Sequence, residues 1–378
     1  MSTAAPAREP IDPTAASAVV SAVSRPRIAS FPPVLDANPY QRLLYAELAR
    51  AGLELEPRPR LRLVWLWRHR KSVGTLHFHW PEAYYRYGSR RRDAWRSWPL
   101  LGLFAIRLAW VKALGYRIAW TIHQVRPHES GSPLVDRLGT GVLVRAADTL
   151  IAHDAATAQE AREAFGRHAG AVEVIPHGSY VGVYPVGRTR EAMRAELRID
   201  PDSFTFLCFG DLRAYKSVEL LLDAFAEADL PEATLVLAGG SASEELAQLV
   251  GEAERDPRVR ARLEFVPETQ VAELFGACDA AVLPRGDGGT SGSLILALSL
   301  GVPVVVARTR SYVELMDGEA SGWLFTPDDR QSLREALEAA AASREDAARR
   351  GANALRQAEE LAWPEIGERT ARALGAAP

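Results

Sequence analysis

Short apolar runs alternate with amphipathic stretches along most of this chain. In the second half, such runs open the segments Phe206–Phe225, Ala233–Gly240 and Cys278–Ala307. Each run has the length of a buried strand, and glycines or small polar residues follow it before a helical pattern begins. Strands that alternate with helices in this way predict a parallel α/β sheet.

The first half shows the same alternation. Strands are expected within residues 27–31, 75–82, 117–129, 149–165 and 171–185. A helix is expected from about Pro39, because Leu43, Leu44 and Leu48 have the spacing of one apolar helix face. Asp154 or Thr157 is expected to cap the helix that follows the fourth of these strands.

A chain of 378 residues is long for a single core and suits two domains. We therefore predict an α/β protein made of two Rossmann-like domains. The expected divisions are a disordered leader at 1–25, an N-terminal domain at 26–185, a C-terminal domain at 197–360 and a closing helix at 361–378.

Composition indicates the cellular compartment of the chain but not its function. The net charge of −3 excludes no class of function, and the two cysteines, Cys208 and Cys278, lie in apolar strand patterns. A reduced, cytoplasmic chain is the expectation. The leader lacks the cationic start and apolar block of a signal peptide. No run reaches the roughly 18–20 apolar residues of a membrane span.

Charge is distributed unevenly. Residues 57–117 contain 14 lysines and arginines against only Glu82 and Asp93, and seven of the nine tryptophans lie between Trp65 and Trp120. Basic and aromatic residues mixed with leucines are typical of a surface that rests on anionic lipid headgroups. The alternatives are a solvated basic face and a nucleic-acid surface, and the latter lacks a recognisable motif. We expect peripheral contact with the inner face of the membrane and no nucleic-acid partner.

Basic and hydroxyl side chains follow two expected strands of the second half. Arg213 and Lys216 can neutralise a diphosphate in place of a metal, since no Asp-x-Asp motif is present. The run from Gly288 to Ser293 opens a helix, where N–H groups and the helix dipole favour phosphate. The alternatives are a solvated pair of charges and a plain capping loop. The candidate phosphate contacts in this run are Gly289, Thr290, Ser291, Gly292 and Ser293.

Six of the eight histidines follow or end expected strands of the first domain: His77, His79, His123, His128, His153 and His177. One histidine in such a place is usually structural, whereas six at one edge of a sheet indicate a polar cleft. The candidate general bases are His123, Glu82 and Asp36. Candidate contacts to the acceptor sugar are His79, His128 and His177. The spacing lacks the HExxH geometry and no thiolates accompany it, so we expect no metal site.

These features resemble the GT-B glycosyltransferases, in particular family 4-like enzymes, best over about residues 200–365. FGDLRAYKSVELLLDAF is similar to that family's glycine turn, basic residue, lysine and helix. Lys216 falls on the lysine that contacts the donor diphosphate. Asp211 stands where the family has an arginine, and Arg213 is its expected substitute.

Other segments extend the resemblance. FVPETQVAELFGACDAAVLP is similar to the segment that passes the nucleobase, which implies base contacts at Val266, Pro267 and Glu268. HGSYVGVYP is similar to the interdomain linker, and Trp363 to a tryptophan of the closing helix. The resemblance implies two domains facing each other across a cleft, with the closing helix crossing back onto the first.

One departure concerns the donor sugar. Family 4 enzymes have two glutamates before a Gly-x-Pro turn, and this chain has Gly288 and Leu296 at those positions. The glycine loop, FHWPE and TIHQVRPHE resemble instead the branch that includes bacterial exopolysaccharide β-mannosyltransferases. This implies direct displacement with inversion, from a donor such as GDP-mannose.

We therefore expect a metal-independent hexosyltransferase without a cofactor, whose partners are a nucleotide sugar and a saccharide or polyprenyl-linked acceptor. The alternatives are a non-catalytic sugar- or nucleotide-binding protein of the same fold and a retaining family 4-type transferase. A GT-B isomerase or phosphorylase is a further alternative, and nothing marks the pyridoxal phosphate lysine that a phosphorylase requires.

Overall fold

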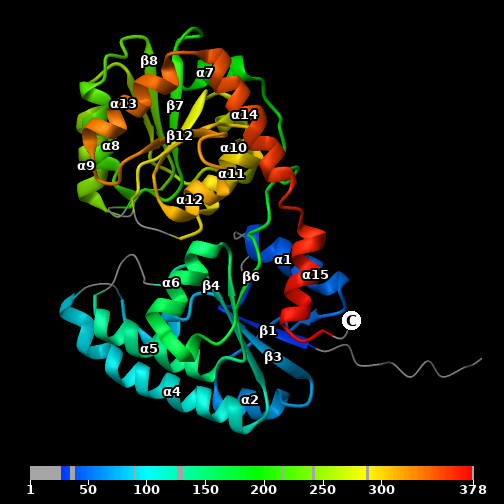
Figure 1. Ribbon diagram of the computed structural model, residues 1–378. Helices are drawn as coiled ribbons and strands as arrows, with labels where there is room; N and C mark the ends of the chain where they lie inside the picture. The colour runs from blue at the N-terminus through cyan, green and yellow to red at the C-terminus, as the bar shows by residue number, and fades with distance from the viewer. Residues whose placement is uncertain are drawn as a thin grey trace, which may run out of the picture.

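The computed structural model describes residues 27–34, 39–88, 91–125, 131–213, 216–240, 243–286 and 289–376. The expected leader and the candidate residues Asp36 and His128 lie outside these ranges, as does Gly288. The chain folds into two lobes, each built around a parallel sheet with helices on both faces (Figure 1). The expected class of two Rossmann-like α/β domains, with a C-terminal helix crossing back, is confirmed.

The first lobe holds the sheet order β2-β1-β3-β4-β5-β6. Its strands are β1 (Arg27–Phe31), β2 (Glu54–Leu55), β3 (Val73–Phe78), β4 (Arg117–Ile122), β5 (Thr149–Ala152) and β6 (Val172–Val174). Its helices are α1 (Pro39–Arg50), α2 (Leu63–His69), α3 (Glu82–Tyr85), η1 (Arg91–Arg96), α4 (Ser97–Ala113), α5 (Pro133–Ala146), α6 (Ala155–Phe165) and η2 (Gly166–Ala169).

Alternation along β3 decides which side chains meet each layer of helices. Leu76 and Phe78 enter the core that α2, α4, α5 and α6 cover. Thr75 and His77 point to the opposite face, because successive side chains of a strand alternate. There α1 and α15 (Trp363–Ala373) pack on the sheet, and the Thr75 hydroxyl donates to the Leu374 carbonyl over 3.1 Å.

The second lobe holds the sheet order β12-β11-β10-β7-β8-β9. Its strands are β7 (Phe204–Phe209), β8 (Ala233–Ala238), β9 (Val259–Arg262), β10 (Ala280–Leu283), β11 (Val304–Ala307) and β12 (Gly322–Phe325). Its helices are α7 (Arg190–Glu196), α8 (Val218–Glu227), α9 (Glu244–Ala253), α10 (Glu268–Gly276), α11 (Gly292–Ser299), α12 (Arg310–Leu315), α13 (Arg330–Ala341) and α14 (Arg344–Glu359). Helices α8, α9 and α13 cover one face of this sheet, and α10, α11, α12 and α14 cover the other.

Two segments pass between the lobes. One runs from β6 to α7, and the other leads from α14 in the second lobe to α15 beside α1 in the first (Figure 1). They touch where the Trp363 indole donates to the Ser179 carbonyl over 2.6 Å and the Ser179 N–H donates to the Leu361 carbonyl over 2.9 Å. A Cβ on Gly178 would lie 2.3 Å from the Trp363 ring, so only glycine fits there.

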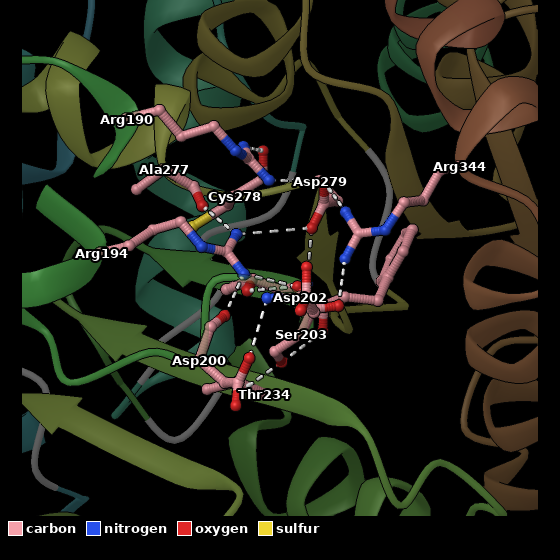
Figure 2. Close-up of polar contacts among 12 residues, drawn as sticks. Arg190, Arg194, Asp200, Asp202, Ser203, Thr234, Ala277, Cys278, Asp279 and Arg344 are labelled. Atoms are coloured by element: carbon pink, nitrogen blue, oxygen red, sulfur yellow. Dashed lines mark hydrogen bonds and ion pairs between the residues drawn. The ribbon is translucent and has the colours of Figure 1, made fainter.

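Three arginines converge on Asp279, directly before β10 (Figure 2). Arg190 and Arg344 contact its Oδ1 at 2.7 and 2.9 Å, and Arg194 lies 3.7 Å from its Oδ2. That second oxygen also accepts from the Thr205 N–H at 2.8 Å. The carboxylate thus ties α7 and α14 to the amino-terminal edge of the sheet, opposite the edge where its loops bind ligands.

We predict that Asp279→Ala lowers the free energy of unfolding by about 2–4 kcal/mol. The cost arises because Arg194, which is 3% exposed, loses its carboxylate partner in a place with little water. Asp346→Ala, which removes ion pairs along the half-exposed surface of α14, is the control and should cost less than about 1 kcal/mol. Urea unfolding curves measure both; equal costs would contradict the prediction.

Candidate active site

A cavity opens where the strand order of the second sheet reverses. From β7 the chain moves outward to β8 and β9, and from β10 it moves outward the other way. Ligands of parallel α/β sheets bind at such a switch point, beyond the carboxyl ends of the strands. The cavity has a volume of about 540 Å³. Its lining residues are Pro39, Tyr180, Tyr184, Cys208, Phe209, Asp211, Lys216, Val282, Leu283, Pro284, Arg285, Thr290, Ser291, Gly292, Ser293 and Leu296.

Two glycines let the loops after β7 and β8 pack closely beneath this cavity. Gly210 and Gly239 have φ angles of +106° and +135°, which L side chains rarely adopt. A Cβ on Gly239 would lie 2.1 Å from the Gly210 carbonyl oxygen, and one on Gly210 would lie 3.0 Å from Lys216 Nζ. The glycine turn therefore leaves the space that the Lys216 ammonium occupies.

Lys216 is half-buried in the cavity wall. Burial lowers the pKa of its ammonium, since water is removed from the charged form; Cys208 and Asp211 partly oppose this shift, and Arg285 and Arg213 add to it. Two neighbouring cations make this region attractive to an anion. The expected partner Arg213 forms an ion pair with Asp211 at 2.9 Å and does not line the cavity, so its contact with a diphosphate stays a prediction.

The loop before α11 contributes hydroxyls and backbone N–H groups. Ser291 caps the helix, its Oγ accepting from the Leu294 N–H at 3.3 Å. Thr290, Ser291, Gly292 and Ser293 line the cavity at the positive end of this helix. Gly289 has a φ of +109°, and a Cβ there would lie 3.1 Å from the His123 carbonyl oxygen. The loop therefore lies directly against the first lobe.

Asp154 holds this loop in place across the cleft. It caps α6 through the Thr157 N–H at 2.6 Å, as one of the two expected caps. Its carboxylate also accepts from the hydroxyls of Thr290 at 2.8 Å and Ser311 at 3.0 Å. A third bond crosses nearby, from the Ala155 N–H to the Glu314 carboxylate at 3.2 Å.

Histidines gather on the first-lobe side of the cleft, at and just beyond the carboxyl ends of β3 to β6. Their members among the described residues are His77, His79, His123, His153 and His177. The Tyr40 ring, at the start of α1, contacts four of them with centroids 4.5–5.7 Å apart. Burial lowers the pKa of all five, to about 3 for His77 and His177, so the cluster is neutral at physiological pH.

His123 is the half-buried member of this cluster, and the other four are buried. Its ring stacks on Trp80 with centroids 4.5 Å apart. His79 lies behind it, and His177 donates from Nδ1 to the Gly178 carbonyl at 2.7 Å. Of the five histidines, His123 is thus the most accessible; it does not line the cavity, and its role as base stays a prediction.

The remaining predicted residues are more dispersed. Glu82 begins α3, beyond the carboxyl end of β3. Val266 is buried in the core of the second lobe, on the face that α10 and α11 cover. Pro267 is the residue directly before α10, and Glu268 forms an ion pair at 3.3 Å with Arg42 of α1. None of these described residues lines the cavity, and their roles stay predictions.

The sequence interpretation missed the aromatic wall of the cavity. Tyr180 and Tyr184 line it from the interdomain linker, with ring centroids 6.0 Å apart. Arg285 adds a cation after β10. Both tyrosines lie in the segment HGSYVGVYP, and Arg285 directly follows the expected strand that ends in Leu-Pro. Neither segment was placed at the site from the sequence.

Within the described residues, no group of three or more His, Cys, Asp or Glu side chains is arranged to hold a metal ion. The helices of the described ranges also include none with the length and apolarity needed to cross a bilayer.

Comparison with known proteins gives the site a class. Residues 189–357, which contain most of the cavity lining, match the family described as Glycosyl transferases group 1. Anabaena Alr3699/HepE, solved in complex with UDP and glucose, has a TM-score of 0.70 at 17% identity, covering 93% of this chain and all of that one. The fold is therefore the GT-B fold, and the match to the group 1 family identifies the protein as a glycosyltransferase.

Two relatives are similar in sequence. A GDP-mannose:glycolipid 4-beta-D-mannosyltransferase of Xanthomonas campestris pv. campestris is 29% identical over 317 residues, covering 81% of each chain. A D-inositol 3-phosphate glycosyltransferase of Kineococcus radiotolerans is 28% identical over 256 residues, covering 62% of this chain and 58% of that protein.

We predict that Lys216→Ala lowers kcat/KM by about 10²-fold or more, the typical cost of removing one electrostatic stabiliser. Lys112→Ala removes an exposed lysine paired with Asp148 and serves as the control. The lowered pKa of Lys216 sets the sign of the pH dependence. As pH rises, its ammonium loses the proton earlier than ordinary lysine (about 10.4), so kcat/KM should fall earlier than in Lys216→Arg. Activity of the alanine variant within about twofold of wild type would refute the role.

Proposed function

We propose that this enzyme transfers mannose from GDP-mannose to a hydroxyl of a lipid-linked saccharide, with inversion and without a metal ion or other cofactor. The observation that carries the proposal is the close approach of the Gly289 loop to the backbone carbonyl of His123, 3.1 Å from where a Cβ on Gly289 would lie. It joins a cation-lined cavity, suited to a diphosphate, to a neutral histidine cluster, suited to a sugar and a base. The mannosyltransferase relative supports the choice of donor and of a glycolipid acceptor. That the acceptor is a precursor of an exopolysaccharide is part of the proposal.

In this scheme the acceptor oxygen attacks the anomeric carbon from the side opposite the diphosphate. The bond from that carbon to the diphosphate oxygen breaks, and GDP leaves with the electron pair. The hydroxyl proton passes to His123, whose lowered pKa keeps it neutral and able to accept. Lys216 and the N–H groups of α11 stabilise the leaving charge, the role that a metal fills in other transferases.

The two positions where family 4 enzymes have glutamates support direct displacement. The position near the donor sugar is Gly288, which offers no carboxylate. The position near the ribose is Leu296, which lines the cavity and cannot hydrogen-bond. Asp211 is the carboxylate among the described lining residues, and Arg213 neutralises it. The first lobe therefore supplies the base.

The acceptor's lipid would be presented by a membrane on which the first lobe rests. Helices α2 and α4 lie along the side of this lobe farthest from the second lobe (Figure 1). Helix α4 buries Leu101, Phe104 and Leu108, yet its outer stripe is apolar too. The exposed apolar residues of these helices and of η1 are Leu63, Val64, Trp67, Trp95, Trp98, Leu103, Ile106 and Trp110.

Basic residues accompany this apolar face. Arg62, Arg68 and Lys71 are exposed. The pKa of Arg107 is lowered, mainly by burial and to a smaller extent by repulsion from Arg62. Cations held near one another beside tryptophans match the anionic headgroups and the interface of a bilayer. We therefore assign the enzyme a peripheral position on the membrane, with the cleft turned away from the bilayer core.

Stereochemistry is tested with GDP-mannose as donor. Inversion of this α-linked donor should give a β-linked product, and proton NMR of the first-formed product reads the anomeric configuration directly. An α-linked product would mean retention, and the assignment of His123 as base would be lost with it.

Membrane contact is tested by co-sedimentation with vesicles that contain phosphatidylglycerol. Arg68→Glu/Lys71→Glu should weaken binding at least about 30-fold, because each basic residue contributes about 1 kcal/mol and the new acids repel the lipid. Added salt should weaken wild-type binding. Arg255→Glu/Arg356→Glu makes the same charge change at exposed sites of the second lobe and should leave binding intact. Equal loss in both variants would point to net charge rather than to this face.

A further inference from the structure

Hydrogen bonds join four side chains in series behind His123. Its Nε2 lies 3.2 Å from His79 Nδ1, and His79 Nε2 lies 3.0 Å from the Tyr45 hydroxyl. The same hydroxyl lies 2.9 Å from His77 Nδ1, and His77 Nε2 lies 2.8 Å from Thr121 Oγ1. These side chains come from α1, β3, β4 and the residues directly after the two strands.

The series is closed to solvent except at its outer end. His77 and Thr121 are 0% and 1% exposed, His79 is 1% exposed and Tyr45 is 4% exposed. Water cannot readily replace a partner there, so each N–H or O–H needs an acceptor among the surrounding side chains, which also include Ser30 beside Tyr45 and Tyr40 beside Thr121. At the outer end, no described residue forms a hydrogen bond with His123 Nδ1.

The arrangement of protons follows from the Tyr45 hydroxyl. It has one proton for two ring nitrogens, so it can donate to only one of the two histidines, and when it does it accepts from the other. If it donates to His77, then His77 carries its proton on Nε2 and gives it to Thr121. His79 then donates from Nε2 to Tyr45, and His123 donates from Nε2 to His79. If the Tyr45 hydroxyl donates to His79 instead, every bond of the series reverses, and His77, His79 and His123 all carry their proton on Nδ1.

We propose that Tyr45, His79, His77 and Thr121 are positioning residues that fix the tautomer of His123. In the Nε2–H setting, His123 Nδ1 keeps a lone pair directed away from the series, which is what a base for the acceptor hydroxyl requires. This inference rests on the proposed function, in which His123 takes that proton. The side chains work as one unit because each bond dictates the next.

The series orients His123 and does not carry charge away from it. Full transfer of a proton along it would make His77 an imidazolium inside the sheet, where burial lowers its pKa to about 3. The groups that face His123 from other elements are His79, His153, His177 and Tyr40, and all resist a charge by the same burial. Burial lowers the pKa of His123 as well, but His123 is the half-buried member at the edge of the cleft, so the positive charge that forms during the reaction is best tolerated there.

The tautomers can be read in the ligand-free protein by long-range proton–nitrogen NMR of histidine-labelled samples. We expect His77, His79 and His123 to share the Nε2–H form. Thr121→Val keeps the shape of the buried side chain but removes the acceptor of the last bond. His77 should then donate from Nδ1 to Tyr45. His123 lies three hydrogen bonds further along the series than His77, and it should change to the Nδ1–H form. Mixed tautomers in the wild type, or an unchanged His123 in Thr121→Val, would overturn the proposal.

Kinetics test the consequence, with GDP-mannose as donor and octyl glucoside as acceptor. Tyr45→Phe and Thr121→Val should each lower kcat about 10-fold or more, the usual effect of losing an orienting partner, with KM changed less than about twofold. Tyr116→Phe is the matched control: it removes another buried phenol, bonded to the Leu66 carbonyl at 2.6 Å, and should change neither kcat nor tautomers. A tautomer change without loss of kcat would refute the positioning role.

The two readouts separate this proposal from the proposed function. If the wild-type protein shows the shared tautomer and its change in Thr121→Val but does not turn over GDP-mannose, the choice of donor or acceptor fails. If turnover is normal and the tautomers are mixed, the proposed function stands and the series has no orienting role.

Discussion

The active site depends on one carboxylate that serves both lobes. Asp154 caps α6 in the first lobe and accepts hydroxyl hydrogen bonds from Thr290 and Ser311 in the second. A cap satisfies N–H groups that a helix leaves unpaired, so this carboxylate would be needed even without a neighbour. The carboxylate can accept further hydrogen bonds, and with these it holds the loop before α11 in place. Helix geometry within one lobe thereby places the ligand loop of the other against His123, and two half-sites become one.

Much of the fold follows from pattern alone. The strand at Arg27–Phe31 and the helix from Pro39 have the bounds that their apolar spacing indicates, because each buries a complete face. Two of the edge strands, β2 and β9, could not be predicted in the same way. β2 is a two-residue strand at Glu54–Leu55, and β9 carries two arginines within Val259–Arg262. Neither has an apolar run of its own, and each becomes a strand because β1 or β8 offers it a partner.

The candidate site divides along similar lines. Position after a strand was enough to select Lys216, the glycine loop and the histidines, since parallel strands bring such loops to one edge. Contacts between distant segments carry no such signal. Tyr180 and Tyr184 reach the cavity only because the linker passes beneath it, and Arg213 turns to Asp211, two residues away. Tyr45 lies in an ordinary amphipathic helix and meets two histidines only once α1 packs on the sheet.

The pair of crossing segments near Trp363 also constrains how the enzyme can move. A single covalent link would let one lobe swivel about any axis relative to the other. Here the strand-to-helix linker and the α14–α15 connection pass side by side and are bonded to each other at Ser179. Two adjacent pivots leave mainly one rotational degree of freedom, about the line that joins them. Substrate entry and product release should then follow a single opening coordinate, along which the bonds from Asp154 to Thr290 and Ser311 must break and form again.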